Sequence, residues 1–289
     1  MSGRAISGKI KINTFDDICG GANDNVVEMP LEKLHEFKNH PFRVIDDEKM
    51  AEMVESVKEY GVLVPGIVRH RAEGGYEIIA GHRRKRASLL AGKTTMPVIV
   101  RRYMDDEATI IMVDSNIQRE DMLISERAHA YRMKYDAMKH QGSKTGGLSL
   151  AELGEQAGES AKTVQRYIYL SRLNDDLLKM VDDGKIGMIP GVDLSFLGEE
   201  QQRWVFEALS ESGVTISKQQ ARFLKDNAKS GELTAKMAKM LFAMEKPKPR
   251  SITLKPNRLN QYFDENWNND EIEELICSLL EEWKKRAGE

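Results

Sequence analysis

Cationic side chains follow a glycine in the run Gly81-His82-Arg83-Arg84-Lys85-Arg86-Ala87. Residues 76–80 read as a short apolar strand, and residues 83–91 read as a helix that Gly92 ends. A helix N-terminus offers unpaired N–H groups and a positive dipole end, so it favours anions and disfavours cations. A polyanion over the turn, most simply a triphosphate, would explain this basic first turn. On composition alone, a solvated basic turn is an equal alternative.

A second polar run follows a helix that we expect at 105–114. It reads Ser115-Asn116-Ile117-Gln118-Arg119. Two small polar side chains followed by Gln and Arg are poor core residues but suit a ligand, and an Asn carbonyl suits magnesium. On these residues alone, an ordinary polar junction between two helices is the favoured interpretation.

Residues 148–173 have the pattern of a helix-turn-helix. A first helix is expected at 151–157, a tight turn at Gly158-Glu159-Ser160, and a second helix at 161–173. The outer face of the second helix and its cap carry side chains suited to base edges and phosphates: Ser160, Lys162, Thr163, Gln165, Arg166 and Tyr169. Such helical pairs also occur without DNA, so the motif alone is a moderate signal.

The remaining pattern divides the chain into short mixed elements and then helices. A helix at 46–60 and strands at 67–71, 76–80 and 96–103 predict a small α+β part. Ser125 is expected to cap a helix reaching residue 140. Further helices are expected at 175–183, 199–211, 217–229 and 234–244.

A proline-rich linker at 246–250 precedes a strand expected at 251–255 and an amphipathic helix at 270–286. The helix carries a large apolar stripe: Ile272, Leu275, Ile276, Leu279, Leu280 and Trp283. So small a segment cannot bury this stripe alone, so we expect it to form a dimer. Folding back onto the helical part is the alternative.

Length and charge set further bounds. The chain has 289 residues and a formal net charge of −3, so it is long enough for about two or three domains and is not a generic polyanion binder. Cys19 and Cys277 lie at opposite ends, which favours a reduced intracellular setting. No apolar run reaches a membrane span and no signal-peptide core is present, so we expect a soluble, cytoplasmic protein without membrane contact.

Four segments together resemble the ParB family of chromosome and plasmid partition proteins. The run from Gly81 to Ala87 resembles its GERRxRA box, and Asp114 to Asp121 resembles its ENIQRED box. Met29 to Leu34 with His40-Pro41-Phe42 is similar to its first box, and Leu63 to Arg69 to the segment that follows. Their order and spacing make the resemblance far more specific than any one box.

The resemblance implies a partition protein that binds a palindromic, centromere-like site on double-stranded DNA as a homodimer. CTP with magnesium would close the dimer into a clamp that slides on DNA, and the protein would be nucleoid- or plasmid-associated, with a ParA-type ATPase as a further partner. Carried over by position, the nucleotide-binding residues are Gly81, His82, Arg83, Arg84, Arg86, Ser115, Asn116, Gln118 and Arg119. Asn116 would also help to hold the magnesium ion.

The implied organisation is an α+β nucleotide-binding domain, an all-α helix-turn-helix domain and a small dimerisation segment. We place a tail at 1–27, the ParB-like domain at 28–124, the DNA-binding domain at 125–245, the linker at 246–250 and the dimerisation segment at 251–289.

Two positions depart from the family boxes. His82 and Ser115 each stand where the family has Glu, and a serine hydroxyl brings no negative charge to a cation. We therefore expect nucleotide binding more than turnover; a slow CTPase activity stays open and no catalytic residue is assigned. The alternatives are a ParB-fold transcriptional regulator of a mobile element or plasmid and, with less support, a sulfiredoxin-like enzyme or small-molecule kinase on the same fold.

Overall fold

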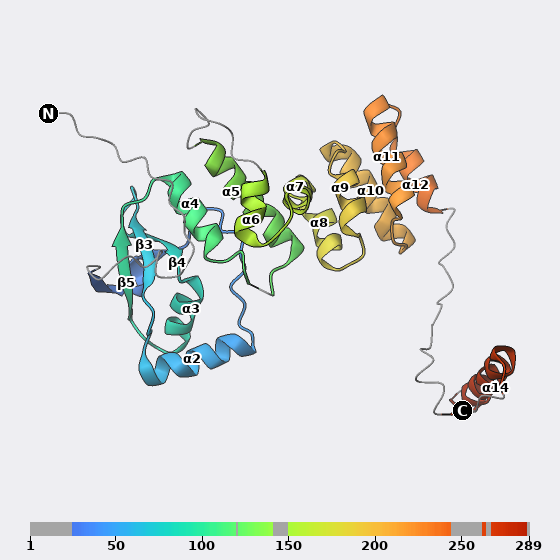
Figure 1. Ribbon diagram of the computed structural model, residues 1–289, viewed down its shortest axis with the longest axis horizontal. Helices are drawn as coiled ribbons and strands as arrows, with labels where there is room; N and C mark the ends of the chain where they lie inside the picture. Colours follow the sequence, from blue (N-terminus) through green and yellow to red (C-terminus); the bar gives the residue numbers. More distant parts are fainter. Residues whose placement is uncertain (1–24, 120, 141–149, 244–261, 264–266, 288–289) are drawn as a thin grey trace. The chain divides into compact units, whose positions relative to one another are not determined.

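The computed structural model describes residues 25–119, 121–140, 150–243, 262–263 and 267–287. The chain divides into one compact unit, Met1–Met244, and a second unit, Glu245–Glu289. Figure 1 labels most of the helices and strands. Within the first unit an α+β part precedes a helical part, which confirms the predicted fold class. The expected tail lies outside the described residues up to residue 24, and β1 begins at Val26.

A five-stranded sheet forms the centre of the α+β part, in the order β1-β5-β3-β4-β2. Its strands are β1 (Val26–Pro30), β2 (Leu34–His35), β3 (Gly66–His70), β4 (Tyr76–Ala80) and β5 (Thr95–Arg101). β3 and β4 form the expected antiparallel hairpin, whereas β5 pairs parallel to β3 and β2 pairs parallel to β4. The short strand β2 and its parallel pairing are not predicted by the sequence.

Side chains alternate between the two faces of the sheet along each strand, and both faces are covered. Ile67 and Ile79 pack into a core that includes Ala108 and Met112 of the next helix, α4 (Asp105–Asp114). On the other face, Val68 and Ile78 pack with residues of the first box and of β5: Met29, Leu31, Leu34, Met96 and Val98. The first box is therefore partly a core element of the sheet.

Two helices beside the sheet position the basic box. α2 (Glu48–Tyr60) is capped by Asp47, whose carboxylate accepts the Met50 N–H at 2.8 Å. α3 (His82–Leu90) packs on it, with Ala87 against Met50, Val54 and Val57. In Figure 1, α2 runs beneath α3, and α4 lies toward the top of the sheet.

The long helix α5 (Ile124–His140) joins the two parts of the unit. The prediction that Ser125 caps it is wrong, because the helix begins one residue earlier. The Ser125 N–H donates to Asp182 at 2.9 Å, and the Glu126 carboxylate accepts the Leu123 N–H at 3.2 Å. The first turn of α5 is thus held by an acidic side chain within the helix and by a neighbouring helix.

The helical part continues through α6 (Leu150–Ala157), α7 (Ala161–Leu170), α8 (Asp175–Asp182), α9 (Met188–Leu194), α10 (Glu199–Ser212), α11 (Lys218–Ser230) and α12 (Ala235–Ala243). The expected helix at 161–173 is too long, since α7 ends at Leu170. Asn174 caps α8 by accepting the Leu177 N–H at 2.9 Å, so the chain must turn before it. The turn also buries Leu173 in the core.

One core runs from the sheet into the helical part. It includes Ile79, Ile111 and Tyr131 together with Val164 and Leu224. The structure therefore packs the predicted ParB-like and DNA-binding regions into a single compact unit.

The second unit is described mainly through α14 (Asn269–Ala287). The linker expected at 246–250 and the strand expected at 251–255 lie outside the described residues. The apolar side chains of α14 are exposed within the unit, with Leu279 at 56%, Leu280 at 58% and Trp283 at 68%. Across the described ranges, we find no helix of the length and apolar character that a membrane crossing needs.

Candidate nucleotide and DNA sites

The glycine turn before α3 has a backbone that only glycine adopts easily. Gly81 has φ 115°, in the left-handed region, and a Cβ there would lie 3.2 Å from Gly66 Cα on β3. β4 thereby leads directly into the N-terminus of α3, beside β3. This is the arrangement in which backbone N–H groups of a first helical turn can reach an anion.

Two arginines of the basic box pair with carboxylates at the start of α2. Arg83 Nη2 lies 2.8 Å from Asp47 Oδ1. Arg86 makes a two-point pair with Asp46, in which Nε donates to Oδ1 at 3.0 Å and Nη2 donates to Oδ2. These guanidinium hydrogen bonds hold the pKa of both carboxyls below the usual range. Arg83 and Arg86 therefore already lie against oxygen anions.

The other two cations of the basic box, Arg84 and Lys85, donate to backbone carbonyls. Arg84 Nη1 donates to Val64 O at 2.7 Å and to Pro65 O at 2.5 Å, which joins α3 to the loop before β3. Lys85 Nζ donates to Leu34 O at 2.7 Å, and burial lowers the pKa of its ammonium. Both side chains help to hold the loops that surround the helix N-terminus.

His82 faces a loop of the first box. Its Nε2 accepts the Phe37 N–H at 3.4 Å, and its ring centroid lies 3.9 Å from that of His40. Burial, and then the neighbouring His40, lowers the pKa of His82 to about 3. Burial also lowers the pKa of His40. His82 is therefore neutral near pH 7, and its ring supports the loop, whereas the family's Glu at this position would be charged.

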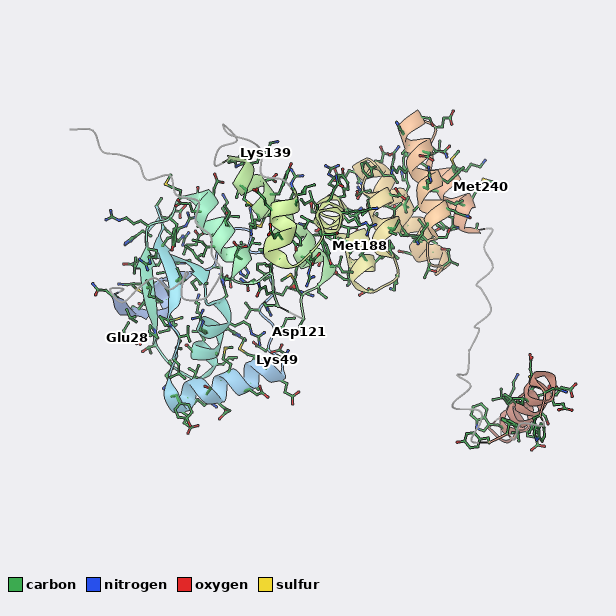
Figure 2. All side chains as sticks on the ribbon, viewed as in Figure 1. Glu28, Lys49, Asp121, Lys139, Met188 and Met240 are labelled. Atoms are coloured by element: carbon green, nitrogen blue, oxygen red, sulfur yellow. The ribbon has the colours of Figure 1, made fainter. Side chains whose placement is uncertain are left out.

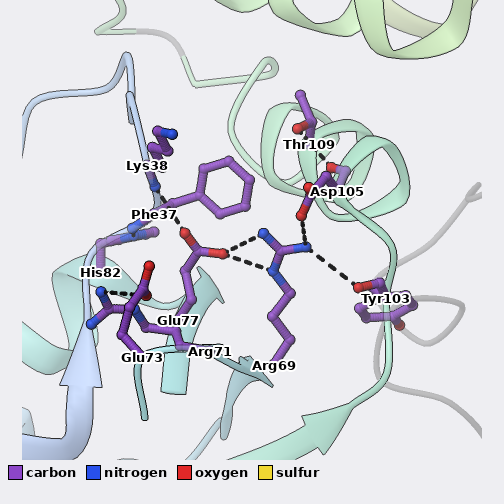
Figure 3. A network of polar contacts seen from close by, with 10 residues as sticks. All are labelled: Phe37, Lys38, Arg69, Arg71, Glu73, Glu77, His82, Tyr103, Asp105 and Thr109. Carbon is purple, nitrogen blue, oxygen red and sulfur yellow. Dashed lines mark hydrogen bonds and ion pairs between the residues drawn. The ribbon is translucent and has the colours of Figure 1, made fainter. Parts of the chain in front are cut away.

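A polar network fixes the same loop from the sheet side (Figure 3). The Arg69 guanidinium lies between Glu77, at 2.6 Å, and Asp105, also at 2.6 Å. Glu77 also accepts the Lys38 N–H at 3.0 Å, and Arg69 lies over the Phe37 ring. With only 15% of the Arg69 side chain and 9% of the Glu77 side chain exposed, this pair is nearly dry and positions loop, strands and α4 together.

The second polar run lies at the end of α4. Asn116 Nδ2 donates to Met112 O at 2.9 Å and to Ser115 Oγ at 3.1 Å, and Ser115 Oγ donates to the same carbonyl at 2.9 Å. The Asn116 amide oxygen is thus directed away from these bonds and is the atom that suits a magnesium ion. Among the described residues, no group of three His, Cys, Asp or Glu side chains could hold a metal ion by itself.

Asp114 does not replace the carboxylate missing at position 115. It pairs with Lys134 of α5, whose side chain is 2% exposed. Burial raises the pKa of Asp114, while the ammonium group opposes that rise. Moving this carboxylate away from the buried Lys134 ammonium would be costly, so Asp114 is committed to the core.

His40 packs on His82 at the start of α3. Burial is the main cause that lowers the pKa of His40, and the charge of Arg119 adds a smaller effect in the same direction. Gln118 is exposed beside Arg119. Lys49 of α2 pairs with Asp121, the last residue of the second box (Figure 2). Ser115 and Asn116, just after α4, both bond to Met112 O in the last turn of that helix.

The expected DNA-binding residues divide into structural and outward-facing groups. Ser160 caps α7 by accepting the Thr163 N–H at 3.1 Å, and the two hydroxyls hydrogen-bond at 2.8 Å. Lys162 and Gln165 are exposed, and Gln165 Nε2 donates to Tyr169 Oη at 3.2 Å. Arg166 is partly exposed on the same helix.

Residues that the sequence analysis did not single out complete the helix-turn-helix. A Cβ on Gly154 would lie 2.3 Å from Glu159 O, so only glycine allows the turn to pack on α6. Arg127 of α5 pairs with Glu159 at 2.7 Å and lies over the Tyr167 ring. The Tyr169 ring contacts Phe196, at 5.1 Å between centroids, and Arg172. Of these residues, Gly154 could have been found from the sequence, because it is a small residue at a short spacing before the turn.

Taken together, the fold and the sites define a class. The chain contains two joined parts. The α+β part has a helix whose N-terminus carries arginines, and the helical part contains a helix-turn-helix. The family model of the ParB N-terminal domain matches residues 17–117. Residues 17–117 thus form a ParB N-terminal domain, and the chain as a whole is similar to ParB partition proteins.

Individual relatives show how far the likeness extends. The chain is 32% identical over 201 residues to the probable chromosome 1-partitioning protein ParB of Deinococcus radiodurans, which covers 70% of this chain and 66% of that protein, just under two thirds. It is 29% identical to the nucleoid occlusion protein of Listeria monocytogenes, over 74% of this chain and 73% of that one. A solved structure of truncated ParB from Caulobacter crescentus, complexed to the centromeric parS site, matches with 24% identity and a TM-score of 0.42 over 70% of this chain and all of that one.

Proposed function

We propose that this protein binds a palindromic, centromere-like site on double-stranded DNA as a homodimer and acts in DNA partition. The observation that carries the proposal is one compact unit in which β4, the strand that leads into the Gly81 turn, and the helix-turn-helix share a continuous core. The relative from Deinococcus, named as a partitioning protein, supports the same role. We further propose a cytoplasmic, nucleoid- or plasmid-associated location and a ParA-type ATPase as partner.

The ligand of the α+β part would be CTP with magnesium. Arg83, Arg84 and Arg86 would hold phosphate oxygens, since guanidinium–phosphate contacts are charge-assisted and two-pointed. The N–H groups after Gly81 would add to them. Asn116 would offer its amide oxygen to magnesium, which otherwise rests on phosphate oxygens and water. The preference for cytosine comes from the family resemblance.

Closure of the dimer on nucleotide binding would turn the protein into a clamp that slides from its site. α5 gives a route for this coupling, because Lys134 holds the end of α4 and Arg127 holds the turn of the helix-turn-helix. These two residues are seven positions apart and so lie on one face of the helix. A change at the nucleotide box can therefore reach the DNA-binding helices through one rigid element.

A second candidate is a DNA-binding regulator on the same fold that does not turn over nucleotide. Ser115 in place of a carboxylate, and the commitment of Asp114 to Lys134, favour it. The distribution on DNA in cells separates the two. A broad zone spreading from one site in chromatin immunoprecipitation supports clamp sliding, whereas isolated sharp peaks support the regulator.

Calorimetry tests the nucleotide site. Wild-type protein should bind CTP with magnesium in preference to ATP or GTP, and cognate DNA should strengthen the effect. Arg83→Ala should abolish binding, because the triphosphate loses a main counter-charge. If the wild type releases no heat and the variant behaves identically, the nucleotide role is wrong and the plain DNA-binding role remains.

A DNA titration tests the recognition helix. Arg166→Ala should weaken binding to the cognate site by about 1–3 kcal/mol if its guanidinium reads a guanine. Lys162→Ala should weaken cognate and random DNA alike, because a phosphate contact carries no sequence information. An unchanged affinity and sequence preference in Arg166→Ala would remove this residue from the interface.

A further inference from the structure

Two carboxylates occupy positions against the arginines of the basic box. Asp47 contacts Arg83 at 2.8 Å, and Asp46 contacts Arg86 at two points. A carboxylate and a phosphate present similar pairs of oxygens to a guanidinium, so one guanidinium edge serves either group. The same edges of Arg83 and Arg86 would be needed for the proposed triphosphate.

We propose that Asp46 and Asp47 compete with the phosphate groups of the ligand for Arg86 and Arg83, and thereby set the affinity of the site for a triphosphate. This inference rests on the proposed nucleotide function. Binding exchanges one ion pair for another: each guanidinium leaves its carboxylate and takes a phosphate oxygen, and the carboxylate turns to water.

The position of α2 makes this competition persistent. Met50, Val54 and Val57 fix α2 on α3 through the contact with Ala87, and the Asp47 carboxylate also caps α2 through Met50 N–H. The start of α2 therefore cannot move far while the core is intact. The carboxylates must give way by side-chain rotation and stay within a few ångströms of the bound phosphates.

The ion pairs are also weak enough to be displaced. The side chains are 19% exposed in Arg83 and 39% in Asp47, and 43% in Arg86 and 47% in Asp46. Partly hydrated pairs of this kind contribute little, whereas a triphosphate brings several negative charges at once. The aspartates thus lower the affinity for anions without closing the site.

Binding of CTP with magnesium and of inorganic tripolyphosphate to the full-length protein tests the competition. Asp47→Asn keeps a capping oxygen but removes the charge, and Asp46→Asn does the same for the other pair. Each variant should bind both anions about two- to fivefold more tightly than wild type. Glu55→Gln is the matched control, since Glu55 lies on the same helix and pairs with Lys58 instead.

A double substitution separates competition from a general charge effect. In protein that already carries Arg86→Ala, Asp46→Asn should leave the affinity unchanged, because the contested guanidinium is gone. Equal tightening in Glu55→Gln, or an undiminished effect in the Arg86→Ala background, overturns the inference.

The remaining outcomes are distinct from failure of the proposed function. If wild type and both aspartate variants bind CTP equally, the competition is wrong and the nucleotide site stands. If Asp47→Asn binds more weakly only with magnesium, this carboxylate supports the metal and the competition is wrong. If neither the wild type nor any variant binds either anion, both proposals are wrong.

Discussion

At the scale of single residues, the neutral rings of His40 and His82 pack together at a position where the family has a charged Glu. Burial removes the water that would stabilise a protonated imidazole, so the pKa of His82 falls from the usual 6.5 to about 3. The unfolded chain then binds more protons than the folded one below about pH 6.5. Stability from His82 is therefore complete above that pH and is lost progressively as the pH falls toward about 3.

We predict that His82→Gln flattens this acid dependence. Between pH 6.5 and 4.5, one such group contributes a slope of up to about 1.4 kcal/mol per pH unit to the free energy of unfolding. Urea unfolding at several pH values measures the slope in wild type and variant. Identical slopes in His82→Gln and wild type would show that His82 is protonated as easily in the folded chain as in the unfolded one.

A second residue prediction concerns Ser115. Its hydroxyl donates to Met112 O and accepts from Asn116. Because a hydroxyl is uncharged, it brings no negative charge to a cation. Ser115→Glu should raise CTP hydrolysis or sharpen its dependence on magnesium, because a carboxylate beside the Asn116 amide is a better ligand for a hard cation. Phosphate release at varied magnesium measures this, with Ser115→Gln as the uncharged control. Equal rates in all three proteins would remove position 115 from the metal site.

At the scale of elements, the helix-turn-helix depends on a close approach of backbone to backbone. The turn folds over α6 so that Gly154 lies under Glu159, and the Glu159 N–H donates to Gly154 O at 2.8 Å. Gly158, by contrast, has φ 70° but open space around it. The two glycines therefore have different reasons to be glycine, one steric and one conformational.

We predict that Gly154→Ala destabilises the first unit by about 1–3 kcal/mol, as an overpacked core does, and removes DNA binding while CTP binding stays measurable. Gly158→Ala should cost about 1–2 kcal/mol, because alanine adopts the left-handed region at that penalty. Denaturant unfolding and separate DNA and nucleotide titrations distinguish the two. If Gly154→Ala keeps full DNA affinity, the turn is more adaptable than this packing implies.

Most elements were predictable because their periodicity or end signals are local. β4 and α4 have the expected bounds, and Gly61 and Gly213 end their helices as glycine should. α9 was missed, because Pro190 and Gly191 read as breakers although a proline is tolerated in a first helical turn. The sheet order could not be predicted. β1 pairs with a strand that is distant in sequence, and β2 pairs in a parallel direction that no hairpin dictates.

The candidate site follows the same division. The residue types at 81–86 and 115–119 pointed to anion and metal chemistry, and the structure places the first set at a helix N-terminus. The partners of these residues were not predictable. Asp46, Asp47 and His40 reach the basic box through loops more than thirty positions away, and only the packed fold sets those contacts.

At the scale of the whole molecule, the described part of the second unit exposes a run of large apolar side chains. Leu279, Leu280 and Trp283 are each more than half exposed on α14, and a groove along the same helix is lined by Trp267 and Leu275 together with Glu271, Glu274 and Ser278. An amphipathic helix with a stripe of this kind is stable in water when a second apolar surface covers it. We therefore expect two copies of residues 251–289 to hold the homodimer.

We predict that a chain ending at Lys246 is a monomer. The first unit has its own continuous core and should stay folded, with CTP binding retained. Each monomer would then bind one half of a palindrome, so the affinity for the full site should fall toward that for a half-site, because the second contact is no longer intramolecular. Sedimentation and DNA titration measure both effects. In the full-length chain, Leu280→Asp should reproduce them and the exposed polar change Glu273→Gln should not. A truncated protein that still sediments as a dimer without ligand would place the main interface in the first unit.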